Sequence, residues 1–186
     1  MRRQAVLIFA TAAATLLLTS VAVLAATTVL KGGTINQVRV VRGEDASVLN
    51  NSTTFADIPG VTTTVSVPRG EEGLILARYS AETICYIVEG TTNTGDNKCS
   101  VRIMVVNNAT GQEIEACPCN QGTNFAFDST SAGTENIYAQ ESHSMDRSVI
   151  VPPGSYTVKA QWAVTHSDVR FRVDDWSFTV EKARVV

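Results

Sequence analysis

The chain has 186 residues, with 15 basic side chains, 18 acidic side chains and a formal net charge of −3. This length suits one domain with its own hydrophobic core. An acidic chain lacks the basic footprint of proteins that bind nucleic acid or anionic lipid without specificity, so we expect no nucleic-acid partner.

The N-terminus has the pattern of a secretory signal. Two arginines in residues 1–4 precede an apolar stretch, Ala5–Leu24, and Val23 and Ala25 place small residues before a cleavage point. This predicts a signal peptide over residues 1–25 and a secreted, extracellular protein. The alternative is an uncleaved anchor, because the apolar run to Leu30 is long enough to cross a bilayer. The membrane would then be a partner, with the β domain outside.

Four cysteines, an even number, fit an exported chain with disulfides: Cys85, Cys99, Cys117 and Cys119. Three pairings are possible, and we favour Cys85 with Cys99 across the base of a hairpin. Cys117 and Cys119 would then pair with each other or stay reduced, and the rival is the crossed pairing. A Cys-x-Cys spacing is unusual for zinc ligands, so these residues do not predict a metal site.

Residues 26–60 are polar and poorly patterned, and we interpret them as a leader or as a first edge strand. From Val61 the chain alternates between apolar and polar residues up to Val67, which is typical of a strand with one buried face. A turn at 68–70 follows. The sequence therefore predicts a β-sandwich domain over residues 61–186.

Further strands follow at short spacing, separated by turn residues. The predicted strands are 74–81, 83–87, 101–106, 113–116, a short one near 125–128, 138–151, 155–164, 169–173 and 176–180. Asp174 and Asp175 are expected to break the last two strands apart. No helix is predicted after the signal.

The stretch 149–162 carries the clearest pattern. A β-branched run ends at Pro152-Pro153-Gly154, where we expect glycine to supply a positive φ. The next strand should bury four side chains and leave three in solvent. The buried set is Tyr156, Val158, Ala160 and Trp162, and the solvent-facing set is Thr157, Lys159 and Gln161. Strands of this kind favour an all-β fold, an antiparallel β-sandwich of jelly-roll type.

Residues that could carry chemistry are few, and we predict no catalytic residue. The histidines are His143 and His166, and the neighbours in His166-Ser167-Asp168 point apart on a turn. Adjacent acids such as Asp174-Asp175 face opposite sides of a strand, so they do not make a glycosidase pair. The oxygen-rich loop 93–97 is ordinary turn composition. No cofactor or metal is expected.

Trp162 and Trp176 are the candidates for ligand contact, because a sugar-binding platform uses large aromatic side chains. Each lies among apolar alternates in a predicted strand, and a core position is the commoner reason for that pattern. Both interpretations stay open from the sequence.

Two motifs resemble small secreted bacterial β-sandwich proteins. They are the Pro-Gly-x-Tyr-x-Val strand that begins at Pro153 and the closing Asp-Trp-x-Phe-x-Val strand over 175–180. Residues 65–70 and 125–128 fit the same pattern, so the likeness covers about residues 61–180. It implies the fold and no activity.

The function indicated by these features is non-catalytic binding outside the cell. The partner would be a carbohydrate or another surface protein. One alternative is a secreted hydrolase of polysaccharides, which needs two carboxyls about 5–10 Å apart. The other is a membrane-tethered structural protein.

Overall fold

A computed structural model describes residues 29–44, 48–90, 95, 97–119, 125–130 and 140–185. The chain divides into two units, 1–30 and 31–186, of which the second holds the folded domain. The predicted signal peptide or anchor lies outside the described residues. Within them, no helix has the length and apolar character needed to span a membrane.

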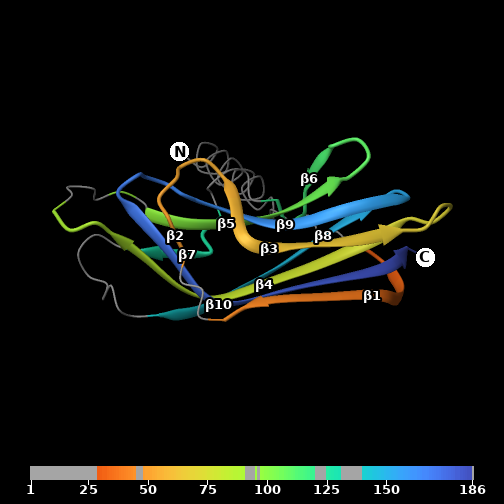
Figure 1. The fold of residues 1–186 in the computed structure, drawn as a ribbon, viewed down its shortest axis with the longest axis horizontal. Helices are drawn as coiled ribbons and strands as arrows, with labels where there is room; N and C mark the ends of the chain where they lie inside the picture. Colours follow the sequence, from red (N-terminus) through yellow and green to blue (C-terminus); the bar gives the residue numbers. More distant parts are fainter. Residues whose placement is uncertain are drawn as a thin grey trace, which may run out of the picture. The chain divides into compact units, whose positions relative to one another are not determined.

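The regular secondary structure of the described residues consists of strands, arranged as two antiparallel sheets (Figure 1). The strands are β1 (Gly32–Gly43), β2 (Val48–Asn50), β3 (Ala56–Val67), β4 (Gly73–Ile87), β5 (Asn97–Asn107), β6 (Glu113–Glu115), β7 (Asp128–Thr130), β8 (Glu141–Val151), β9 (Gly154–Val164) and β10 (Val169–Val185). Sheet A has the order β1-β10-β4-β8, with β2 beside β10. Sheet B has the order β3-β9-β5-β6, with β7 beside β5. The predicted β-sandwich is confirmed.

The strand pairing is nested. Apart from the short β2 and β7, β1 pairs with β10, β3 with β9, β4 with β8 and β5 with β6, all antiparallel. A long hairpin rolled around the core gives this order, because successive pairs alternate between the two sheets. It is the order of a jelly roll.

The core lies between the sheets and follows the predicted alternation in β9. Tyr156, Val158, Ala160 and Trp162 are all buried. Thr157 and Lys159 are half-buried on the opposite face, whereas Gln161 is buried there. The Tyr156 hydroxyl donates a 2.8 Å hydrogen bond to the carbonyl oxygen of Pro152, which fixes the turn before the strand.

Residues 26–60, interpreted from the sequence as a leader or a first edge strand, include an edge strand of the sandwich. Residues 32–43 form β1, an edge strand paired with β10, and β3 begins at Ala56 rather than Val61. Most side chains of β1 are exposed on both faces, so its sequence does not alternate. In β3 a register shift between Asp57 and Thr62 interrupts the alternation just before Val61.

Asp174 and Asp175 do not end a strand. β10 runs through them with a register shift between Asp174 and Trp176, and Asp175 has a φ of 34°. A bulge of this kind absorbs an extra residue without ending the pairing. Similarly, the two segments predicted at 74–81 and 83–87 are one strand, β4.

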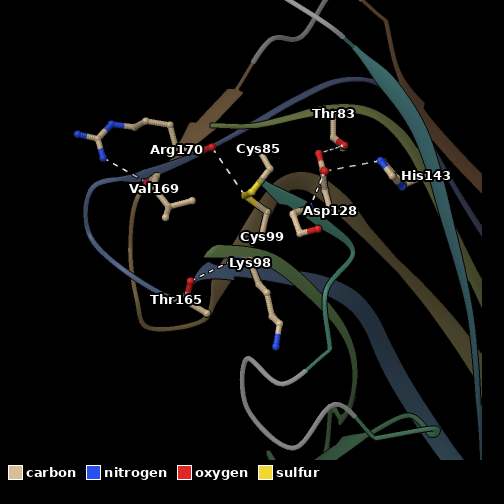
Figure 2. Close-up of a disulfide and its surroundings, with 10 residues drawn as sticks. Thr83, Cys85, Lys98, Cys99, Asp128, His143, Thr165, Val169 and Arg170 are labelled. Carbon is tan, nitrogen blue, oxygen red and sulfur yellow. Dashed lines mark hydrogen bonds and ion pairs between the residues drawn. A yellow bond between two sulfur atoms is a disulfide. The ribbon is translucent and has the colours of Figure 1, made fainter. Parts of the chain in front are cut away.

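Cys85 and Cys99 are joined by a disulfide, with their Cα atoms 5.9 Å apart (Figure 2). Cys85 belongs to β4 in sheet A and Cys99 to β5 in sheet B, so the bridge links the two sheets rather than a hairpin within one sheet. Cys117 and Cys119 are joined to each other in the segment after β6.

Candidate functional site

The two tryptophans do not form an exposed platform. Trp162 is 4% exposed and packs on Phe171, with ring centroids 5.7 Å apart. Trp176 is 6% exposed, and its indole lies against the backbone of Gly43 and Gly60. Trp176 borders a shallow pocket of about 660 Å³ on the sheet A side. Both tryptophan side chains therefore belong to the hydrophobic core and are largely inaccessible to a ligand.

A group of polar and charged side chains lies on the outer face of sheet B, where six side chains from four neighbouring strands meet. We call this set the charged ribbon: Asp57, Arg102, Glu113, Glu115, Lys159 and Gln161. The strand register explains the set. Gln161 of β9 lies opposite Asp57 on one side and Arg102 on the other. Side chains opposite one another on one face of a sheet are close enough to interact.

Hydrogen bonds and ion pairs connect the side chains of the ribbon. Nε of Arg102 donates to Oε1 of Gln161 at 2.8 Å, and Nε2 of Gln161 donates to Oδ1 of Asp57 at 2.6 Å. Nζ of Lys159 contacts Asp57 at 3.1 Å and Oε1 of Glu113 at 3.4 Å. The amide of Gln161 therefore couples the guanidinium group to the carboxylate.

The cationic side chains of the ribbon are held against the sheet. The side chains of Arg102 and Lys159 are 25% and 17% exposed. The Arg102 guanidinium also stacks over the ring of Phe55 at 4.2 Å from its centroid, an attractive cation–π arrangement. The ribbon is thus pre-ordered, which lowers the entropy that a ligand must overcome on binding.

The charges stabilise one another. Burial disfavours the ionised form of Asp57, but Gln161, Lys159 and Arg102 outweigh it and hold the pKa of Asp57 below its ordinary value. Burial also disfavours the charged form of Lys159, but Asp57 and Glu113 outweigh it and raise the pKa of Lys159. Both groups are therefore ionised at neutral pH.

A pocket of about 420 Å³ opens beside the ribbon, where β3 bulges away from β9. Asp57 and Lys159 line it together with Pro59, Thr62 and Thr157. The bulge is made possible by Gly60, whose φ is +78°. The pocket has apolar walls and two charged groups at one side.

The sequence predicted part of this site. Lys159 and Gln161 were expected on the solvent-facing side of their strand, and Arg102 faces away from the core as its alternation indicates. Asp57 was not predicted as a site residue, because residues 26–60 show no clear alternation of apolar and polar residues. The calcium-type loop considered at 93–97 lies largely outside the described residues.

No protein-family model and no curated protein matches the chain. The solved structure of the CBM22-1–GH10 modules of Clostridium thermocellum endo-1,4-beta-D-xylanase 10B with xylohexaose is similar over 76% of this chain and 24% of that chain. The identity is 12% and the TM-score 0.35. Dimeric latent PorU from Porphyromonas gingivalis is similar over 82% of this chain and 14% of that chain, at 13% identity and a TM-score of 0.28.

This chain therefore spans a minor part of each matched protein. Likenesses of this size concern the fold alone and carry no ligand or activity across. They name no family, so the resemblance to secreted bacterial β-sandwich proteins stays an expectation.

Proposed function

We propose that this protein is a non-catalytic, exported binding domain that recognises a polyhydroxylated ligand, an oligosaccharide, on the outer face of sheet B. The observation that carries the proposal is the charged ribbon together with the pocket beside it. Ligand sites combine a concave apolar wall with a few well-placed polar groups. Asp57 accepts hydrogen bonds and Lys159 donates them, which matches the mixed donor and acceptor character of sugar hydroxyls.

The electrostatics favour binding over hydrolysis at this site. A glycosidase needs a carboxylic acid with a raised pKa that protonates the leaving group. Asp57 has its pKa lowered, and its carboxylate is already bound to Lys159 and Gln161. It is therefore suited to accept hydrogen bonds from a ligand and poorly suited to donate a proton.

The predicted signal peptide and the disulfides support the export part of the proposal, because disulfides persist in oxidising compartments. Mass spectrometry of the mature N-terminus tests it. A chain that begins near residue 26 is expected, whereas a chain that begins at Met1 would show that the anchor is kept.

The binding part is tested with a glycan array followed by calorimetry on the best oligosaccharide. Lys159→Ala should lower the affinity at least about tenfold, because a buried hydrogen bond to a charged group is lost. Arg78→Ala is the matched control: its cation also pairs with an aspartate, Asp146 at 2.8 Å, but on the outer face of sheet A. Equal affinities for the two variants, or no glycan bound at all, would reject the proposal.

A further inference from the structure

Three side chains of types that bind metals, Asp128, Glu141 and His143, lie close together at one edge of the sandwich. Figure 2 shows two of them, Asp128 and His143, beside the Cys85–Cys99 disulfide. Asp128 belongs to β7 in sheet B, and Glu141 and His143 begin β8 in sheet A. One ligand atom of each side chain lies within 4.8 Å of the other two. The cluster was not foreseen from the sequence, where no metal was expected.

The two contacts of His143 are closer in length to the spacing of ligand atoms around a shared ion than to a direct hydrogen bond. Nε2 of His143 is 3.7 Å from Oδ1 of Asp128 and 3.4 Å from Oε2 of Glu141. Nε2 is buried and has no hydrogen-bond partner in the described structure. Tetrahedral zinc with bonds of about 2.0–2.2 Å separates its ligand atoms by roughly 3.3–3.6 Å. A charge-assisted hydrogen bond would be shorter, at about 2.7–2.9 Å.

Asp128 is held in place by two further hydrogen bonds. Its Oδ2 accepts from the Thr83 hydroxyl and its Oδ1 from the backbone N–H of Ser129, each at 2.7 Å. Its side chain is 8% exposed. Outer groups that orient a ligand in this way are a regular feature of metal sites. The His143 ring is also fixed, because it packs against Phe127 with centroids 5.7 Å apart.

We propose that Asp128, Glu141 and His143 bind one divalent transition-metal ion, such as Zn²⁺. One imidazole and two carboxylates suit zinc, whereas calcium takes six to eight oxygen ligands. The side chains of His143 and Glu141 are 28% and 69% exposed, so water reaches the site as the fourth ligand. Because Asp128 comes from sheet B and the other ligands from sheet A, the ion joins the two sheets at this edge.

The test uses the full mature protein without a histidine tag, titrated with zinc chloride by calorimetry and heated with and without zinc. We expect one zinc per chain and a melting temperature about 5–10 °C higher at a zinc concentration of about 100 times Kd. Cobalt should give visible d–d bands of tetrahedral intensity. His143→Ala should lose all three effects. His166→Ala is the matched control and should keep them, because His166 is exposed on a turn.

Glu141→Gln keeps the test valid if His143→Ala fails to fold, since Glu141 is exposed and its substitution does not disturb the core. We expect this variant to weaken zinc binding at least about tenfold while far-ultraviolet circular dichroism stays unchanged. Absence of zinc and cobalt binding by the unmodified protein would overturn the proposal. So would equal binding by the unmodified protein and the folded Glu141→Gln variant.

Discussion

The hydroxyl of Thr83 donates a 2.7 Å hydrogen bond to Oδ2 of Asp128, and both side chains are buried between the sheets. Thr83 lies in β4 of sheet A and Asp128 in β7 of sheet B, so the bond ties one sheet to the other. A buried carboxylate that loses a partner bears a desolvation penalty. The bond is therefore a stabilising contact as well as a support for the proposed metal ligand.

Thr83→Val should lower the free energy of unfolding by about 1.5–3 kcal/mol, measured by urea unfolding without added metal. Thr157→Val is the matched control. Its hydroxyl donates a bond of the same length, 2.7 Å, to Asn108, but at an exposed position. The control should lose about 0.5 kcal/mol or less, because water replaces the partner. Equal losses of unfolding free energy in the two variants would mean that the buried hydrogen bond stabilises the fold no more than the exposed one.

The indole of Trp176 occupies the space that a side chain on Gly43 would need. A Cβ atom at Gly43 would lie 2.5 Å from Nε1 of Trp176. Gly43→Ala should therefore cost about 1–3 kcal/mol through overpacking, measured by urea unfolding. The loss should shrink in a Trp176→Phe background, since the clashing ring atoms are removed. Additive losses in the double variant would contradict the packing explanation.

Gly154 is needed for a different reason from the one that the sequence indicates. The Pro153-Gly154 turn predicts a positive φ, but the backbone of Gly154 is outside the left-handed region. Instead, a Cβ atom there would lie 3.2 Å from Cε2 of Tyr156. A Cβ atom at Gly154 would therefore push the tyrosine ring, whose hydroxyl bonds to Pro152, slightly out of its place.

The two explanations for Gly154 predict opposite orders of stability for the variants Gly154→Ala and Gly154→Asn. If space decides, Gly154→Ala should cost about 1 kcal/mol and Gly154→Asn more, because asparagine is larger. If a left-handed backbone decided, asparagine would be tolerated better than alanine. Chemical unfolding of both variants distinguishes the two cases, and a more stable asparagine variant would reject the packing explanation.

The fold could be predicted from the sequence wherever one face of a strand is buried. β9 up to Ala160 and the C-terminal half of β3 alternate cleanly, because each has a core side and a solvent side. β1 could not be assigned by the same rule, since an edge strand with both faces exposed has no alternation to read. The bulge at Asp175 was taken for a break because local sequence does not show whether pairing resumes.

The charged ribbon and the proposed metal cluster could not be predicted from the sequence, because their members are far apart along the chain or lie in different sheets. Asp57 and Gln161 are 104 residues apart in the chain, and only the pairing of β3 with β9 places them opposite one another. Asp128 and His143 come from different sheets. Aspartate and histidine are common residues, and the spacing of these two matches no known metal-binding motif. Only the fold brings them close together.

The Cys85–Cys99 disulfide should stabilise the fold far more than the Cys117–Cys119 bond. The first closes a loop between residues 14 apart and the second between residues 2 apart. A loop of about 15 residues corresponds to about 3 kcal/mol in the chain-entropy description. Cys85→Ala with Cys99→Ala should lose about that amount in urea unfolding. A larger loss for the Cys117→Ala, Cys119→Ala pair would reverse the expected order.

The Asp57–Lys159 pair should make stability depend on pH at both ends of the scale. The pKa of Asp57 is lowered in the folded state, so its contribution is present above the ordinary carboxyl pKa of 3.8 and is lost as the pH falls through the folded value. The pKa of Lys159 is raised, so its contribution is present below 10.5 and is lost as the pH rises through the folded value.

Asp57→Asn tests the acid limb of this dependence. Because the Asp57 side chain is 57% exposed, solvent screening limits the loss near neutral pH to about 1 kcal/mol or less. The difference between the unmodified protein and the variant should be steady from about pH 5 to pH 8 and should shrink as the pH falls below 3.8 and through the lowered folded pKa. Urea unfolding across this range measures it. In a Lys159→Met background the difference should be smaller throughout, because the cation that lowers the carboxyl pKa is gone. A difference that persists unchanged in acid would show that Asp57 acts through packing rather than charge.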